Sequence, residues 1–285
     1  MRIKYNIRRS IELANFLIKL CRQEDMRNHI PHVANQECIY ILANGPSLNQ
    51  SLTDIINNKR YLTDCMMSMN FFSNDERYEI IKPKYHVISD PMFYDAPGHE
   101  ERVADFFVNI NAKTTWPITL FVPYRFWKDK VWQGKFTNQN ISLIPFHQVT
   151  PPYDCLFLNW IAQHGLIGVN FGSVLHHCIY VSLLSGYKEI FLYGADHTFF
   201  DGLCVNDNNQ VCKKTTHFYD ENPDVVPIFH TYTGVKTAYT MSHFLSEYAG
   251  IFKGHELLRR IASTFSAKII NVTPGSMIDA YERQV

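Results

Sequence analysis

The sequence predicts an α/β fold with a Rossmann-like, mostly parallel sheet, helices on both faces and a lid insertion. Two observations predict the sheet. Short runs rich in β-branched and aromatic residues alternate with longer segments of helical periodicity. Several of the short runs are almost continuously apolar, which is typical of strands buried on both faces of a parallel sheet. A long polar and aromatic segment late in the chain breaks this alternation and predicts the lid.

The alternation predicts each element in chain order. The expected strands are Cys38–Ala43, Cys65–Met69, Tyr85–Ser89, Ile118–Val122, Ile141–Ile144, Glu189–Tyr193 and Lys268–Val272. The expected helices between them cover 50–58, 98–110, 173–186 and 252–265. The division that follows is an N-terminal helix in 1–35, a Rossmann-like domain in 36–196 with 236–285, and a lid in 197–235. Within the lid, the NDNN sequence predicts a hairpin turn, and a helical pattern resumes at about Val235.

Composition excludes several classes of protein. The chain has 285 residues, of which 46% are hydrophobic and 19% charged, so it has enough apolar material for a large core and is not a disordered chain. Its formal net charge is zero, which argues against a nucleic-acid partner bound mainly through phosphates. The seven cysteines form no CxxC pair, and this spread suits a reducing cytoplasm rather than a disulfide framework.

The N-terminal segment is basic and amphipathic. Residues 1–30 hold seven Lys or Arg against three acidic residues. Apolar residues recur near helical spacing at Ile7, Ile11, Leu13, Phe16, Leu17 and Leu20. Two interpretations remain open: residues 1–25 lie on an anionic membrane surface, or the helix packs on the domain with a solvated basic face. The first would place a cytoplasmic protein on the inner face of the plasma membrane. The segment has no signal-peptide cleavage pattern, and no run reaches the roughly 18 apolar residues of a membrane span.

The sharpest local feature is the sequence ILANGPSL at 41–48. A buried strand leads directly into Asn44-Gly45-Pro46-Ser47, and a helix follows. Glycine permits a tight turn and the close approach of a ligand to the backbone, and Ser47 is expected to cap the helix. The free amides and the helix dipole would then form a phosphate site at the carboxyl end of the first strand. An ordinary strand–turn–helix corner is the alternative.

Other strand ends carry residues suited to ligand binding. In an open parallel sheet, ligands bind outside the carboxyl ends of the strands, so these ends are expected to share one crevice. A glycine and a serine before the helix at 173–186 offer a further helix N-terminus to the same ligand. The candidate residues are Asn70, Asp90, Gly172, Ser173, Gly194, Asp196 and His197.

The ordered set of these motifs resembles the bacterial family-42 sialyltransferases. It comprises the NGPSL turn at 44–48, Asn70, Gly172-Ser173-Val174, the sequence GYKEI at 186–190, Gly194-Ala195-Asp196, and the C-terminal run KIINVTPGS at 268–276. The resemblance covers about 38–90 and 170–280. The chain is also similar to polysaccharide-cluster proteins and to hydroxymethylpterin-pyrophosphokinase-like proteins that share the glycine-proline-serine turn.

The resemblance implies a GT-A-like fold with a lid, and a metal-independent, inverting transfer of a nonulosonic acid from a CMP-sugar to a glycan hydroxyl. No cofactor is implied, because the CMP-sugar is the substrate. By the same resemblance Asn44, Gly45 and Ser47 hold the donor nucleotide and phosphate, Asn70 contacts the donor, and Asp196 binds the nucleotide. Ser173 would reach the sugar carboxylate or the phosphate. Asp90 stands where the family has an asparagine, which leaves its role less defined.

The sequence departs from the family after Asp196, where His197, Phe199 and Phe200 replace the tyrosines that hold the leaving phosphate. His197, His217 or Tyr219 is then expected to meet the charge of that phosphate. The family's base is a histidine just beyond the lid, and histidine suits proton transfer near neutral pH. His217 is the first candidate for the base, and His243 and His230 are the alternatives.

Two other functions remain open. The same turn would serve a pyrophosphokinase-like phosphoryl transferase that uses ATP and Mg²⁺, or a nucleotide-sugar-binding protein without turnover. No DxD pair occurs in the chain, in agreement with a transferase that needs no metal, although Asp90 alone would still be able to recruit Mg²⁺. The donor sugar, the acceptor and a homo-oligomeric state are left open by the sequence.

Overall fold

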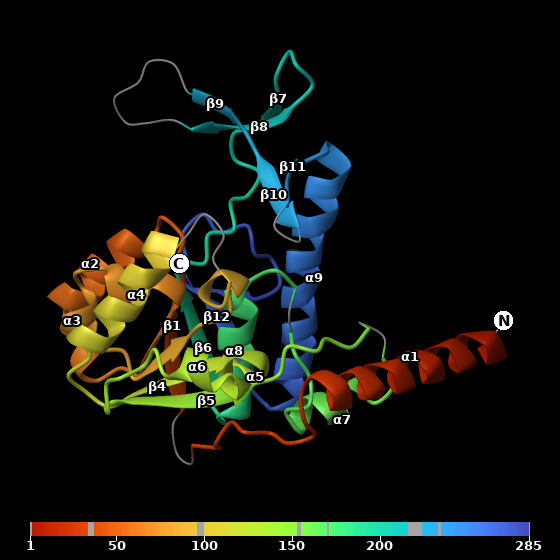
Figure 1. Cartoon of the computed structure of the whole chain (residues 1–285), viewed down its shortest axis with the longest axis horizontal. Coiled ribbons are helices and arrows are strands. Elements are labelled where there is room, and N and C mark those ends of the chain that lie inside the picture. Colours follow the sequence, from red (N-terminus) through yellow and green to blue (C-terminus); the bar gives the residue numbers. More distant parts are fainter. Residues whose placement is uncertain are drawn as a thin grey trace.

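The computed structural model describes residues 2–33, 37–95, 100–152, 155–169, 171–215, 224–232 and 235–284. A central sheet has helices on both of its faces, and a group of short strands rises above it beside a long helix (Figure 1). The α/β fold with a mostly parallel sheet is therefore as the sequence predicts.

The sheet strands are β1 (Cys38–Leu42), β2 (Met66–Met69), β3 (Tyr85–Val87), β4 (Ile118–Pro123), β5 (Ile141–Phe146), β6 (Glu189–Tyr193), β12 (Lys268–Asn271) and β13 (Glu282–Arg283). The helices are α1 (Arg2–Gln23), α2 (Leu48–Asn57), α3 (Tyr78–Ile81), α4 (Glu100–Lys113), α5 (Tyr124–Lys128), α6 (Lys130–Gln133), α7 (Leu158–Gln163), α8 (Val174–Leu184) and α9 (Met241–Thr264). All seven predicted strands are present, and the short β13 was not predicted.

The strand order of the described sheet is β13-β12-β6-β1-β2-β3-β4-β5, and each ladder between neighbours is parallel. The chain runs outward from β1 to β5 and then returns to add β6 on the other side of β1. The order therefore reverses between β1 and β6. Loops diverge at such a reversal and leave a crevice beyond the carboxyl ends of the two strands.

Each face of the sheet has its own apolar core. On one face, Ile39 and Ile41 of β1 belong to a buried cluster with residues of α1, α7, α8 and α9. On the other face, Leu42 belongs to a cluster with α2 to α6. Successive strand residues point to opposite faces, so the apolar run of β1 fills both cores. Helix α8 is buried around almost its whole circumference, which explains why its apolar residues are not confined to one face.

The segment predicted to form a lid contains two small sheets, the second of which ends at Ala238. Strands β7 (Leu203–Val205), β8 (Val211–Thr215) and β9 (Asp224–Pro227) form one, and the NDNN turn joins β7 to β8 as predicted. Strands β10 (Phe229–Tyr232) and β11 (Val235–Ala238) form an antiparallel hairpin. The prediction that a helix resumes at about Val235 is wrong, because that segment pairs with β10 and α9 begins at Met241.

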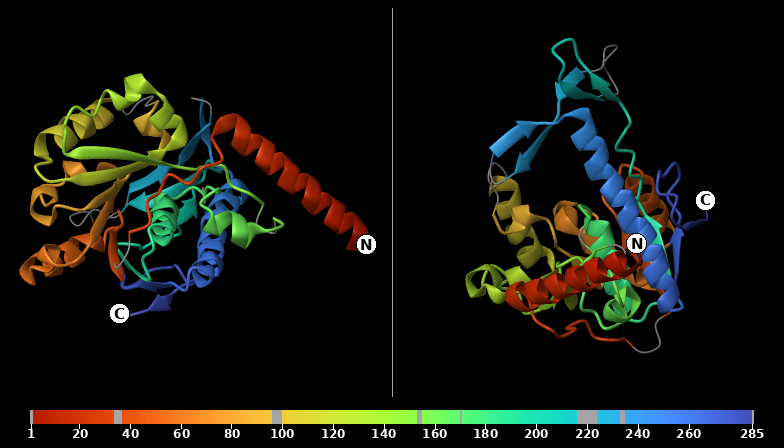
Figure 2. Two further views of the ribbon diagram at one scale, coloured as in Figure 1. Left: turned by 90° about the horizontal axis from the view of Figure 1, so that it is seen from below. Right: turned by 90° about the vertical axis from the view of Figure 1, so that its right-hand side faces the viewer.

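Helix α1 is part of the folded body and also extends beyond it. Phe16 and Leu20 are buried in the same core cluster as β1, and Leu13 and Leu17 pack against that cluster. The N-terminal half of the helix projects away from the sheet as an arm (Figure 2). Among the helices that the structure describes, none combines the length and the apolar character needed to cross a bilayer.

Candidate functional site

The turn after β1 is held by the carboxylate of Asp196, which follows β6. The Ser47 hydroxyl donates to Oδ2 of Asp196 at 2.8 Å, and the Ser47 amide donates to Oδ1 at 3.3 Å. The Gly45 amide donates to the carbonyl oxygen of Gly194 at 2.8 Å. A Cβ atom at Gly45 would overlap the Asp196 carboxylate and lie 2.5 Å from the Gly194 carbonyl oxygen, so only glycine fits there.

This arrangement changes two expectations for the turn. The prediction that Ser47 caps α2 is wrong, because its hydroxyl is bonded to Asp196 and makes no capping bond. The amides of Gly45 and Ser47, expected to be free for a phosphate, already have protein acceptors, and Pro46 has no N–H. The Asp196 carboxylate supplies negative charge at the N-terminus of α2. A ligand phosphate would have to displace it to reach the Ser47 amide, and the Gly45 amide would have to leave the Gly194 carbonyl oxygen.

The C-terminal TPGS sequence supports the loop that carries Asp196. The Ala195 amide donates to the Thr273 hydroxyl at 3.0 Å, and the Ser276 hydroxyl donates to the Ala195 carbonyl oxygen at 2.6 Å. The Met277 amide donates to the Asp196 carbonyl oxygen at 2.8 Å. The loop after β6 is therefore fixed from both sides, by the β1 turn and by the segment after β12.

Asn70 follows β2 and brings an unpartnered polar atom to the same edge of the sheet. Its carbonyl oxygen accepts from Nε2 of His86 at 2.9 Å, so Nδ1 of that ring accepts the Ser68 hydroxyl at 2.8 Å. Asn70 adopts a left-handed conformation with φ of 47°. The residue is only 9% exposed, and Oδ1 has no hydrogen-bond partner among the described residues. A buried amide oxygen without a donor is costly, which makes it a ligand-binding candidate.

His197 lies at the end of a chain of buried hydrogen bonds. Its Nε2 lies 3.0 Å from Nε2 of His255, whose Nδ1 lies 2.9 Å from the Tyr281 hydroxyl. Within the described residues this phenol has no other acceptor, so its proton is satisfied only if it donates to His255. His255 then donates through Nε2–H to His197, which carries its own proton on Nδ1. Burial lowers the pKa of His197 to about 4, so the ring stays neutral at pH 7.

These groups meet in one pocket of about 440 Å³ beyond the ends of β1, β2 and β6. Lid residues Phe199 and Lys213, and α9 residues Glu247, Tyr248 and Ile251, line its other side. The predicted residues that line it are Asn44, Gly45, Pro46, Asn70, Asp90, Gly172, Ser173, Gly194, Asp196 and His197. The crevice expected from the strand ends is thus a single cavity, and Ser47 is not among its lining residues.

Two of the predicted residues also organise the pocket wall. The Ser173 side chain accepts from the Leu175 amide at 3.3 Å and so caps α8, whose first residues line the pocket. The Asp90 carboxylate accepts from the Met92 amide at 3.0 Å and caps a short 3₁₀ turn at Pro91–Phe93. Both are therefore cap residues whose side chains sit at the pocket edge.

The histidines proposed as the base fall in different places. His217 and Tyr219 lie outside the described residues. The rings of His230 and His243 meet at 4.4 Å between centroids, and Tyr239 packs against both. His243 is also linked to the pocket, because its Nε2 lies 4.0 Å from a carboxylate oxygen of Glu247.

Sequence reasoning missed several residues of this site. Neither His255 nor Tyr281 is among the predicted site residues. No sequence pattern marks Lys213 or Glu247 as a residue of the site. The spacing of Glu247, Tyr248 and Ile251 does place these three on one face of a helix, and all three line the pocket. No group of three His, Cys, Asp or Glu side chains is arranged to hold a metal ion within the residues that the structure describes.

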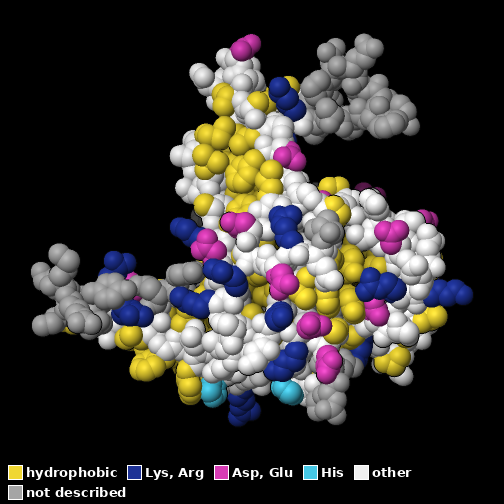
Figure 3. All heavy atoms as spheres, turned by 180° about the vertical axis from the view of Figure 1, so that it is seen from behind, with side chains coloured by type: hydrophobic (Ala, Val, Ile, Leu, Met, Phe, Trp, Pro, Cys, Tyr) yellow, Lys and Arg dark blue, Asp and Glu magenta, His cyan; other side chains and the backbone are white. Residues whose placement is uncertain are grey.

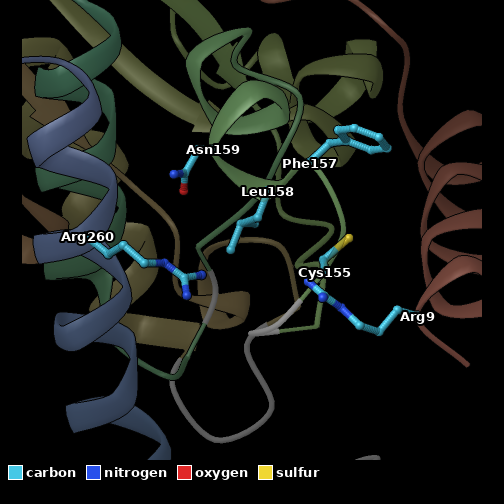
Figure 4. A pocket seen from close by; sticks show the side chains of 6 residues that line it. All are labelled: Arg9, Cys155, Phe157, Leu158, Asn159 and Arg260. Carbon is cyan, nitrogen blue, oxygen red and sulfur yellow. The ribbon is translucent and has the colours of Figure 1, made fainter. Parts of the chain in front are cut away.

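A second pocket lies between α1, α7 and α9, away from the strand ends (Figure 4). Its volume is about 340 Å³, and arginines from two different helices reach into it. The lining residues are Arg9, Cys155, Phe157, Leu158, Asn159 and Arg260. None of the predicted site residues belongs to it.

Comparisons with family models, with curated proteins and with solved structures find no match to the chain. The function is therefore inferred from the chemistry of the pocket.

Gly45→Ala is expected to destabilise the fold by about 1–3 kcal/mol, because the added methyl group meets the Asp196 carboxylate and a backbone carbonyl. Gly250→Ala is the matched control, since a Cβ atom there meets nothing within 4 Å and lies inside α9, where alanine is favoured over glycine. Urea denaturation of both variants checks this. Equal stability of the two variants would contradict the packing described for the turn.

Stability is expected to fall as the pH is lowered from about 6.5 to 4. Burial lowers the pKa of His86 to about 4 and that of His177 to about 3, so the unfolded chain binds protons in this range before the native state does. The loss is on the order of 3 kcal/mol for His86. Urea denaturation at several pH values measures it. His86→Gln, which does not titrate, should give a shallower dependence; an unchanged slope would contradict the assignment.

Proposed function

We propose that the protein is an inverting glycosyltransferase that moves a nonulosonic acid from a CMP-sugar to a hydroxyl of a bacterial surface glycan. The observation that carries the proposal is the buried Oδ1 atom of Asn70, which lines the pocket at the strand ends without a hydrogen-bond donor of its own. A donor from a ligand, such as a nucleobase amino group or a sugar hydroxyl, would satisfy this atom. The choice of CMP as the nucleotide rests on the resemblance to the family-42 sialyltransferases.

The pocket offers groups for each part of such a donor. Its volume falls within the usual range for small-molecule sites. Asn44, Asn70 and Asp90 would contact the nucleoside from the β1 to β3 side. Ser173 and the N-terminus of α8 would face the sugar carboxylate. In this proposal the sheet is the nucleotide-binding part of a GT-A-like fold, and the lid covers it.

The reaction requires one proton acceptor and a stabilised leaving group. As the acceptor oxygen attacks the anomeric carbon, the new glycosidic bond forms and the bond from that carbon to the phosphate oxygen breaks. The base takes the hydroxyl proton, and CMP departs with the bonding electrons. Fixed hydrogen-bond donors aimed at the phosphate lower the barrier without having to reorganise.

His197 is suited to be such a donor. The hydrogen-bond chain through His255 and Tyr281 places its proton on Nδ1, which has no partner among the described residues. Its pKa of about 4 keeps the ring neutral, which makes it a poor base near pH 7 but a constant N–H donor. Lys213 adds a positive charge to the wall of the same pocket.

The base is assigned to a histidine near the lid. His217 remains the first candidate on the resemblance. Among the described histidines, His243 has the most suitable surroundings, because Glu247 lies beside it and lines the pocket. At 4.0 Å the carboxylate makes no hydrogen bond to the ring and accepts the Tyr239 hydroxyl instead, but its negative charge would stabilise the imidazolium that forms during proton transfer.

Asn70→Gly is expected to weaken CMP binding about tenfold, because one hydrogen bond to the ligand is lost. Glycine tolerates the left-handed backbone at this position. Asn209→Gly is the matched control, since Asn209 is another left-handed asparagine and is exposed in the lid. Titration calorimetry with CMP, in the presence of EDTA, measures the effect.

Parallel titrations with UDP, GDP and ATP plus Mg²⁺ separate the functions. Binding of ATP only with Mg²⁺ would favour the phosphoryl transferase. CMP binding without hydrolysis or transfer of any CMP-sugar would indicate a protein that has lost turnover.

His217→Ala is expected to lower turnover at least about 100-fold while CMP affinity stays unchanged, which is the usual effect of losing a general base. Steady-state transfer assays together with calorimetry separate the two effects. Near-normal turnover in this variant would move the role to His243 or His230, each tested by the same substitution.

A further inference from the structure

Helix α1 has a second apolar stripe that the body does not cover. Ile7, Ile11 and Ile18 are 55%, 56% and 50% exposed. At about 100° per residue, the three side chains lie within about 40° of one another around the helix. Phe16 and Leu20, which pack into the core, lie on a different side. The helix therefore has apolar surface beyond what its packing on the domain needs.

Basic residues border the exposed stripe. Arg8, Lys19 and Arg22 are exposed and follow the stripe on one side of the helix. The sequence of α1 contains six Lys or Arg and a single acidic residue, Glu12. Viewed from behind the molecule, hydrophobic side chains gather along the lower edge of the arm and Lys and Arg along its upper part (Figure 3).

Helix α7 continues the apolar surface at the base of the arm. Phe157, the residue before α7, is 70% exposed, and Trp160 within it is 56% exposed. They line an apolar groove together with Leu13 and Leu17 of α1. Exposed aromatic rings beside a basic amphipathic helix are typical of proteins that insert into the headgroup region of a bilayer.

We propose that α1 and α7 together bind the surface of an anionic lipid bilayer. The apolar stripe and the two aromatic rings enter the headgroup boundary, and the basic side chains contact the lipid phosphates. The positive charge of α1 favours a lipid surface over a second copy of the chain as the partner of the stripe. Two copies of α1 packed along the stripe would bring like charges together, whereas an anionic surface neutralises them. The proposal does not depend on the function of the strand-end pocket.

The test is cosedimentation of the full chain with vesicles of phosphatidylcholine alone and with vesicles that also contain anionic phosphatidylglycerol. We expect at least tenfold stronger binding to the anionic vesicles, and weaker binding at high salt. The double variant Ile11→Asp/Ile18→Asp should lose at least tenfold in vesicle affinity. Lys19→Gln/Arg22→Gln should lose the preference for anionic vesicles.

Val108→Asp with Ile80→Asp is the matched control, because both side chains are exposed apolar residues on α4 and α3, away from α1. This control should bind vesicles as the unmodified chain does. Substitution is preferable to deleting 1–25, since deletion would also remove Phe16 and Leu20 from the core.

Equal binding to neutral and anionic vesicles, or an Ile11→Asp/Ile18→Asp variant that binds normally, would overturn the proposal. Size-exclusion chromatography with light scattering gives the other outcome. If the unmodified chain is a dimer that the isoleucine variant dissociates, and vesicles are not bound, the stripe is an interface between copies and the proposal fails.

Discussion

The site depends on one carboxylate, that of Asp196, which joins the two strands between which the sheet order reverses. It accepts two hydrogen bonds from Ser47 after β1 and is carried by the loop after β6. Without a side chain at Gly45, the two loops approach closely enough for this contact. The pocket wall formed by Asn44, Gly45 and Gly194 follows from that approach.

The sequence was sufficient to predict the sheet and the place of the pocket. Continuous apolar runs such as Cys38–Leu42 are a strong strand signal, and polar residues directly after such runs must meet at one edge of a parallel sheet. Asn70, Asp90 and His197 therefore line the same pocket, as expected from their positions after the strands.

The details that were missed depend on contacts distant in sequence. Ser47 has the residue type and position of a helix cap, but its hydroxyl donates to a carboxylate 149 residues further along the chain and accepts no amide of α2. The segment Val235–Ala238 pairs with β10 as a strand, and this pairing with a neighbouring strand was not predicted. The hydrogen bonds from Tyr281 through His255 to His197 span most of the C-terminal third, and no local pattern reveals them.

Some polar groups of the pocket already have hydrogen-bond partners and others do not, and this difference limits which ligands the pocket can bind. Asp196 is already paired with the β1 turn, whereas Oδ1 of Asn70 and Nδ1 of His197 have no partners among the described residues. The first is an acceptor and the second a donor, so a ligand has to offer both a donor and an acceptor. A nucleotide does so through its base or ribose and its phosphate.

The most direct measurement is a crystal structure of the protein grown with CMP. The account predicts the nucleotide in the strand-end pocket, with a donor of the base or ribose within hydrogen-bond distance of Asn70 Oδ1 and a phosphate oxygen within hydrogen-bond distance of His197 Nδ1. A nucleotide bound elsewhere, with the Asn70 amide facing only ordered water, would contradict it.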